Sequence, residues 1–131
     1  MSGYLVDTSI FVAAEQQRSL TDPPSGEARI SVATVTELIV GVRRATGSRL
    51  RTLREATLAE ARSYIAVPYD EPVAERLGEL LAAARGAGVR AGAMDAIIAA
   101  TALVHELEVW TQDEDFETLA RLAPELRVSR A

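Results

Sequence analysis

The sequence contains no cysteine and no lysine, and its only histidine is His105. The absence of cysteine excludes disulfide bonds, a thiolate nucleophile and cysteine-ligated zinc sites. The absence of lysine excludes Schiff-base catalysis and a P-loop, because both depend on that amine. A single histidine is too few for most histidine-based metal sites. Carboxylates are therefore the main groups left for chemistry.

The sequence also lacks any apolar run long enough for a membrane span. Its N-terminus has no basic region followed by a long apolar stretch, so we expect a cytoplasmic protein without a membrane segment. The 131 residues show no break in composition, and 48% are hydrophobic. These values predict one domain over residues 1–131 with a sizeable core.

The charge balance limits the kinds of nucleic-acid binding to expect. The net charge is −5, and all 14 basic residues are arginine. This balance argues against a general nucleic-acid coat protein, because phosphate binding normally shows as a basic surface. It does not exclude a nuclease whose charge is concentrated in a metal pocket.

Short apolar runs alternate with amphipathic segments along the chain. We expect strands at 4–6, 29–32, 65–68, 108–111 and 126–128. We expect helices at 9–14, 35–42, 49–64, 70–85, 95–106 and 116–122, with Ser48 capping the third of them. This alternation predicts an α/β fold of three layers, α/β/α, with a central, mainly parallel sheet of about five strands.

Four scattered acids stand at related places in this pattern. Asp7 ends the first apolar run, Asp113 closely follows the fourth, Asp95 opens an apolar helix and Glu37 lies inside another. In open α/β sheets the ligand crevice lies outside the carboxyl ends of the strands. Carboxylates that meet there repel one another unless a hard cation neutralises them, and Mg²⁺ and Mn²⁺ suit such oxygen ligands. The pattern predicts metal-assisted chemistry on phosphates.

Each acid also has a purely structural interpretation, which stays open at this point. Asp7 can cap the following helix, and Asp95 stands where a helix dipole favours a negative charge. Glu37 can face solvent, and Asp113 lies in an acidic cluster, 113–115, that is typical of a solvated helix start. The occurrence of four acids on four elements, all compatible with one end of one sheet, favours a shared site.

Other polar residues are candidates for supporting roles. The hydroxyl groups of Thr8 and Thr111 lie beside the acids and can orient a carboxylate or a metal-bound water. Ser9 is at least as well explained by capping. A local basic run can meet a phosphate backbone or serve only solubility. It consists of Arg43, Arg44, Arg49, Arg51 and Arg54.

Four blocks of the sequence resemble the signature blocks of PIN-domain ribonucleases, and in particular those of VapC toxins. The blocks lie at 5–9, 35–38, 94–101 and 110–116, in the expected order, so the resemblance covers essentially the whole chain. It implies a PIN fold and Mg²⁺- or Mn²⁺-dependent hydrolysis of RNA phosphodiester bonds, with a 5′-phosphate and a 3′-hydroxyl as products. It also implies a homodimer that a VapB-type antitoxin inhibits.

The family's acids correspond to Asp7, Glu37, Asp95 and Asp113. The resemblance implies that they are the catalytic and metal-binding residues, with Asp7 and Asp95 as the main ligands. Asp115 is an auxiliary candidate that competes with Asp113 for the role of fourth acid. Since a guanidinium matches carboxylates well, we expect an antitoxin arginine to enter the acidic pocket.

Two other functions fit parts of the pattern. A PIN-like binding module that does not cleave RNA would keep the fold and the partner, and a metal-dependence assay would distinguish it. A phosphoacceptor receiver-like signalling domain also places acids at strand ends. Receiver domains use a lysine, and this chain has none.

Overall fold

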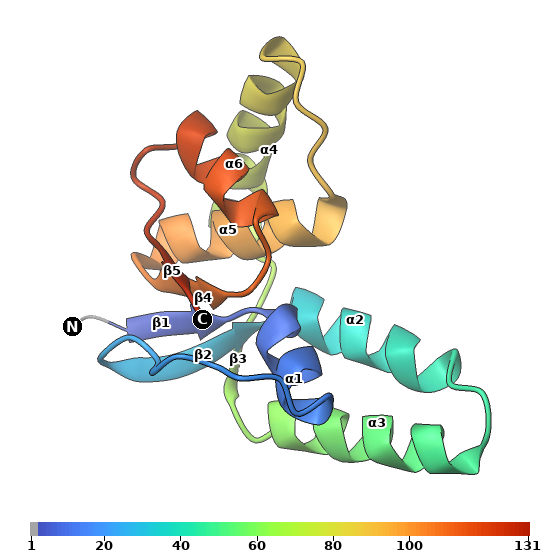
Figure 1. Ribbon diagram of the computed structural model, residues 1–131. Coiled ribbons are helices and arrows are strands. Elements are labelled where there is room, and N and C mark those ends of the chain that lie inside the picture. Colours follow the sequence, from blue (N-terminus) through green and yellow to red (C-terminus); the bar gives the residue numbers. More distant parts are fainter. Residues whose placement is uncertain (1–2) are drawn as a thin grey trace.

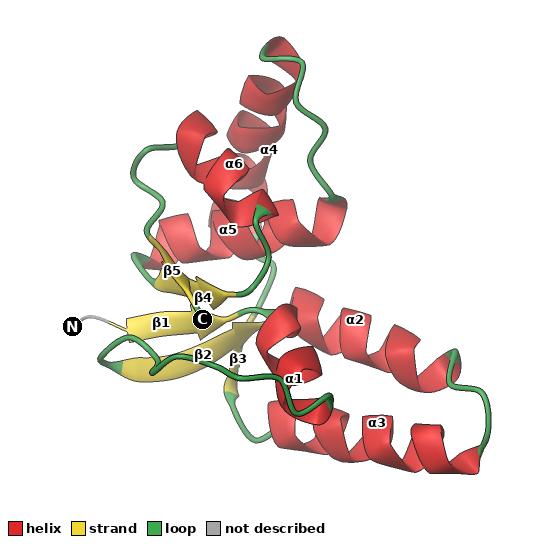
Figure 2. Cartoon of the chain, viewed as in Figure 1, coloured by secondary structure: helices red, strands yellow, loops and turns green. Residues whose placement is uncertain are grey.

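The computed structural model describes residues 3–131, which fold around a five-stranded, wholly parallel sheet with the order β3-β2-β1-β4-β5 (Figures 1 and 2). The strands are β1 (Gly3–Val6), β2 (Glu27–Ser31), β3 (Ile65–Val67), β4 (Glu108–Thr111) and β5 (Val128–Arg130). The helices are α1 (Thr8–Glu15), α2 (Val32–Arg43), α3 (Ser48–Ala61), α4 (Glu71–Gly86), α5 (Ala93–His105) and α6 (Asp115–Leu122). The predicted α/β/α fold with a parallel sheet is confirmed.

The helices form one layer on each face of the sheet, with α1, α2 and α3 on one side and α4, α5 and α6 on the other (Figure 1). Successive side chains of a strand point to opposite faces of the sheet, so they pack alternately against the two helical layers. Leu5 packs into the core under α4, α5 and α6, whereas Val6 packs with Trp110 and the first three helices. Both cores are therefore built on the same sheet.

The chain reverses its direction of travel across the sheet beside β1. From β1 it continues outward to β2 and β3, and it then crosses to β4 and β5 on the other side of β1. The carboxyl ends of the adjacent strands β1 and β4 thus form the topological switch point, where open α/β sheets bind their ligands. Val6 stands beside Trp110 in the register, so Asp7 and Thr111 follow at this same edge.

Helix α5 is buried along most of its length, as its apolar sequence predicts. Ala96, Ala99, Ala100 and Ala102 are fully buried. Their small side chains let the helix axis approach the sheet closely, and α5 contacts β1, β2 and β4. This packing fixes the N-terminal turn of α5, which carries Asp95, next to the switch point.

Most boundaries differ from the sequence prediction by one to three residues, the third helix for example ending at Ala61 instead of 64, and three differences have a local cause. Val32 begins α2 instead of ending β2, because the Ser31 hydroxyl caps that helix through Ala33 N–H. The cap of α3 is Gly47, with φ 84°, and Ser48 is the first helical residue. The last strand begins at Val128, two residues late, because the backbone N–H of Leu126 donates to the Ala123 carbonyl at 2.9 Å in a turn, and its side chain is buried in the core.

The helices of residues 3–131 are also either too short or too polar to cross a membrane.

Candidate active site

Asp7 lies at the centre of the sheet's carboxyl edge, directly after β1. Its backbone N–H continues the strand pairing by donating to the Trp110 carbonyl at 3.0 Å. Its side chain is almost fully buried, with 2% exposed, and accepts from Ser9 N–H at 3.3 Å as the N-cap of α1. The capping interpretation is therefore correct, and the same carboxylate still points into the switch point.

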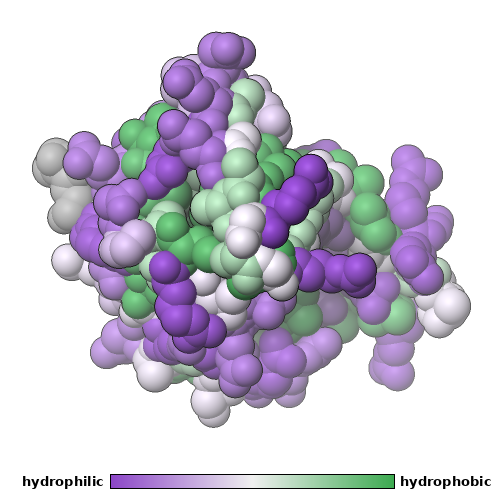
Figure 3. Space-filling model, turned by 90° about the horizontal axis from the view of Figure 1, so that it is seen from above, coloured by the Kyte–Doolittle hydropathy of each residue, from purple (hydrophilic) through white to green (hydrophobic). Residues whose placement is uncertain are grey.

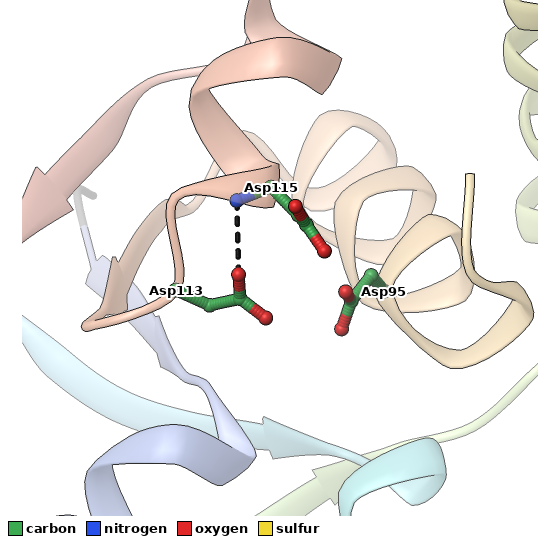
Figure 4. A group of neighbouring side chains, drawn as sticks. All are labelled: Asp95, Asp113 and Asp115. Carbon is green, nitrogen blue, oxygen red and sulfur yellow. Dashed lines mark hydrogen bonds between the residues drawn. The ribbon is translucent and has the colours of Figure 1, made fainter. Parts of the chain in front are cut away.

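Three further acids meet where the start of α5, the turn after β4 and the start of α6 come together (Figure 4). Carboxylate oxygens of Asp95, Asp113 and Asp115 lie within 4.8 Å of one another. Asp113 Oδ1 accepts from the backbone N–H of Asp115 at 2.9 Å, so the turn fixes both residues. Asp95 and Asp113 are half-buried, whereas Asp115 is exposed.

Glu37 approaches the same space from α2. The Thr8 hydroxyl donates to Glu37 Oε1 at 2.6 Å, which ties α2 to the first residue of α1. The Thr8 hydroxyl also lies 3.0 Å from Thr34 Oγ1, and Thr34 is fully buried one turn before Glu37. Glu37 is therefore half-buried and fixed instead of solvated, with its second carboxylate oxygen left for a ligand.

Hydroxyl groups connect the acids through a directed network. Thr111 Oγ1 donates to Asp7 Oδ2 at 2.8 Å and accepts from Asp113 N–H, also at 2.8 Å. Because the single Thr111 proton is used on Asp7, the Ser9 hydroxyl, 3.1 Å away, must be the donor to Thr111. Ser9 Oγ in turn accepts from Gln112 N–H at 2.9 Å. The network joins the turns after β1 and β4.

Burial disfavours the charged forms of Asp7, Glu37 and Asp95, and repulsion by other acids adds to this effect for Glu37 and Asp95. Burial raises the pKa of Asp7, although hydrogen bonds from Ser9 and Thr111 oppose it. Burial also raises the pKa of Glu37, opposed by the Thr8 hydrogen bond and reinforced by the charges of Asp7 and Asp113. For Asp95, burial and then the charge of Asp113, with smaller effects of Asp7, Glu37 and Asp115, raise the pKa to about 7. The charges of neighbouring acids thus contribute to the raised pKa values of Glu37 and Asp95.

The arrangement suits a hard divalent cation. Every donor is an oxygen of a carboxylate or a hydroxyl, the type that Mg²⁺ and Mn²⁺ prefer. Within residues 3–131, no arginine or histidine forms an ion pair with any of the five acids. A cation would replace the protons that the raised pKa values retain.

The structure thus brings together all the acids that the sequence indicates, as one close group of three and two further acids beside it. Asp95, Asp113 and Asp115 form the close group, and Asp7 and Glu37 face it from β1 and α2. The auxiliary candidates Thr8 and Thr111 both bond to these acids, and Ser9 combines capping with the hydroxyl network. Sequence reasoning missed Thr34, because a threonine in an apolar helix looks like core. Its spacing of three residues from Glu37 was the available signal.

Comparisons with known proteins agree with this geometry. The family model described as PIN domain matches residues 4–122. The chain is 43% identical over 100 residues to ribonuclease VapC8 of Mycobacterium tuberculosis, covering 75% of this chain and 88% of that protein. It is 35% identical over 116 residues to ribonuclease VapC4 of the same organism, covering 88% and 89%.

Solved structures resemble the whole chain. A chain in the crystal structure of VapBC-5 from Mycobacterium tuberculosis, a member of the VapBC family of toxin–antitoxin systems, aligns with a TM-score of 0.85. Its identity is 30%, and both chains are covered completely. A chain of FitAcB from Neisseria gonorrhoeae aligns with a TM-score of 0.69 and 27% identity, covering 95% of each chain.

Proposed function

The chain belongs to the PIN-domain family, and on this basis we propose that it is a metal-dependent endoribonuclease and the toxin of a toxin–antitoxin pair. The observation that carries the proposal is the meeting of Asp7, Glu37, Asp95 and Asp113 at the topological switch point. Relatives named as ribonucleases cover most of the chain and supply the reaction class. We take residues 1–131 as a single PIN domain that acts in the cytoplasm.

Asp7 and Asp95 would hold Mg²⁺ or Mn²⁺, assisted by Glu37 and Asp113. When bound, such a cation polarises a phosphate oxygen and lowers the pKa of a coordinated water. Thr111 holds one oxygen of Asp7, so the direction of that carboxylate is fixed before any ligand arrives. Thr8 does the same for Glu37. This preorganisation reduces the rearrangement needed when charge develops on the scissile phosphate.

We propose that water attacks phosphorus and that the 3′ oxygen is the leaving group, as the family resemblance implies. These bonds formed and broken give a 5′-phosphate and a 3′-hydroxyl, whereas attack by the ribose 2′-hydroxyl would give a 2′,3′-cyclic phosphate. Asp115 is exposed, whereas Asp95 and Asp113 of the same close group are half-buried, so we assign Asp115 an auxiliary role.

We further propose that the protein forms a homodimer and is inhibited by a VapB-type antitoxin. The structures that it resembles are toxin–antitoxin complexes by their descriptions. An acidic pocket without an internal cation is a natural acceptor for an arginine of a partner, because the guanidinium fork matches carboxylate geometry. An apolar segment of the antitoxin would supply most of the affinity.

The test is RNA cleavage by the purified protein with the metal removed and restored. We expect no cleavage of single-stranded RNA in EDTA, and cleavage after addition of excess Mg²⁺ or Mn²⁺. End analysis should give 5′-phosphate and 3′-hydroxyl termini. A binding module without activity would leave the RNA intact in every buffer, and 2′,3′-cyclic phosphate ends would contradict the hydrolytic route.

A further inference from the structure

A groove of about 250 Å³ lies beside the acids, between α1, α2 and α3. Thr8 and Glu37 line it at one end, so it is continuous with the acid site, and Arg44 and Arg54 line it too. The groove therefore leads from the acid site onto the arginines of α2 and α3.

The helix α2 sets the spacing between the acid and the arginine. Glu37, Gly41 and Arg44 follow one another at i, i+4 and i+7, which places them on one face of the helix. At about 1.5 Å per residue, Arg44 lies about 10.5 Å from Glu37 along the helix axis. A strand seated at the acids and running along this face would therefore pass Arg44 further along the groove.

Gly41 and Arg54 shape the middle of the groove. Arg54 crosses from α3 and donates to the Gly41 carbonyl at 2.7 Å, so its guanidinium is held in place with further N–H groups to donate. A glycine inside a helix costs about 1 kcal/mol relative to alanine. Here it leaves the groove without a side chain at that point.

The groove is lined by two arginines and two acids, and the hairpin that carries the arginines is basic as a whole. Within residues 3–131, neither Arg44 nor Arg54 forms an ion pair. Glu15, the other acid in the groove, accepts from the Thr57 hydroxyl at 2.7 Å. Residues 32–62, which form the projecting α2–α3 hairpin, contain six arginines and three glutamates in a chain of net charge −5. In Figure 3 the end of this hairpin is covered by hydrophilic side chains.

We propose that this groove, bordered by Glu37, Arg44 and Arg54, binds the RNA strand next to the scissile phosphate, with the two arginines holding a phosphate further along the strand. The proposal rests on the ribonuclease function and adds the place and direction of the substrate strand. The second groove on the same hairpin, lined by Arg43 and Arg51, provides internal controls. Arg43 is adjacent to Arg44, and Arg51 lies one turn before Arg54. The two members of each pair therefore differ mainly in which groove they line.

The experiment measures binding separately from cleavage. Fluorescence anisotropy of a labelled single-stranded RNA of 12 nucleotides and mixed sequence is recorded in EDTA from 50 to 200 mM salt, and a gel checks that the RNA stays intact. Loss of one phosphate contact should lower the slope of log affinity against log salt by about 0.7. We therefore expect R44A and R54Q to lose affinity, with slopes lower by this amount, and R43A and R51A to lose clearly less. R54Q keeps a donor for the Gly41 carbonyl, which protects the fold.

Equal losses for R44A and R43A would contradict the proposal, because they would indicate a diffuse basic field. Unchanged RNA affinity with weakened binding of a protein partner would also overturn it, and would assign the groove to that partner. Absence of both RNA binding and metal-dependent cleavage in the wild type would instead refute the ribonuclease function itself. If the wild type cleaves RNA while R44A and R54Q bind as tightly as it does, only the groove proposal fails.

Discussion

The Thr111 hydroxyl donates a 2.8 Å hydrogen bond to the buried carboxylate of Asp7, across the 104 residues that separate them in sequence. It joins the turn after β4 to the turn after β1, the two strand ends that form the switch point. Together with the cap bond from Ser9 N–H, this bond fixes the Asp7 carboxylate, so the acid site depends on the pairing of β1 with β4.

Replacement of Thr111 by valine keeps the shape but removes this donor. Asp7 then loses a hydrogen bond and Asp113 N–H loses its acceptor, so we expect a loss of about 1–3 kcal/mol in the free energy of unfolding. The rate of RNA cleavage should also fall, and cleavage should require more Mg²⁺. Thr111→Ser keeps the hydroxyl group, so its stability and its cleavage rate should stay close to those of the wild type. Denaturant unfolding followed by Trp110 fluorescence, with cleavage assays, measures this. A valine variant equal to the wild type in both assays would show that the bond is dispensable.

The metal-free protein should lose stability as the pH rises from about 4 to about 7. The pKa of Asp95 is about 7 in the folded protein against 3.8 ordinarily, so the folded state binds more protons than the unfolded chain in this interval. The free energy of unfolding must therefore decrease as the pH rises, and the raised pKa values of Asp7 and Glu37 act in the same direction.

Urea unfolding in EDTA at several pH values tests this dependence. We expect Asp95→Asn to flatten the pH profile, and excess Mg²⁺ to restore stability at pH 7 and above by binding the folded state. A metal-free protein whose stability increases over this interval would contradict the proposed repulsion among the acids.

Asp113 should matter more than Asp115 for cleavage. Asp113 is half-buried, and its charge raises the pKa of both Glu37 and Asp95, whereas Asp115 is exposed and affects only Asp95. Asp113→Asn keeps the side-chain acceptor for Asp115 N–H, so the turn should persist. We expect the larger loss of activity in Asp113→Asn, a smaller one in Asp115→Asn and none in the neighbouring control Glu114→Gln. The reverse order of the two aspartates would assign the fourth acid to Asp115.

Inhibition by the antitoxin should depend on an arginine that reaches the acids. Titration of the ribonuclease with its antitoxin, sought as the product of the neighbouring gene, should abolish cleavage. Changing the antitoxin arginine that is expected to enter the acid site to alanine should weaken this inhibition. Excess Mn²⁺ should partly oppose the wild-type inhibitor, because cation and guanidinium compete for the same carboxylates. Equal inhibition by both forms, unaffected by Mn²⁺, would refute direct entry of an arginine and leave steric covering of the site.

The sequence predicts most of the fold because alternating strands and helices admit few arrangements of a parallel sheet. Asp7, Asp95 and Asp113 are predictable for the same reason, since strand ends and helix starts meet at one edge. The orientation of Glu37 is not, because it depends on how α2 packs beside α1, and only the Thr8 contact reveals it. The crossing of Arg54 to Gly41 likewise depends on the angle between two helices, which local sequence does not encode.

The central claim is that the acids at the switch point hold the cation that RNA cleavage requires, and single-charge variants test it most directly. Asp7→Asn and Asp95→Asn keep the side-chain shape, so the fold should persist and stability should change little or rise as repulsion is relieved. The measurement is the rate of cleavage of one RNA by the wild type and by each variant over a range of Mn²⁺ concentrations, with unfolding curves as the control. We expect the cleavage rate of both variants to fall at least about a hundredfold, because loss of a residue that only supports a metal ligand already costs up to about a hundredfold. Cleavage by either variant at the wild-type rate and the wild-type Mn²⁺ concentration would contradict the claim.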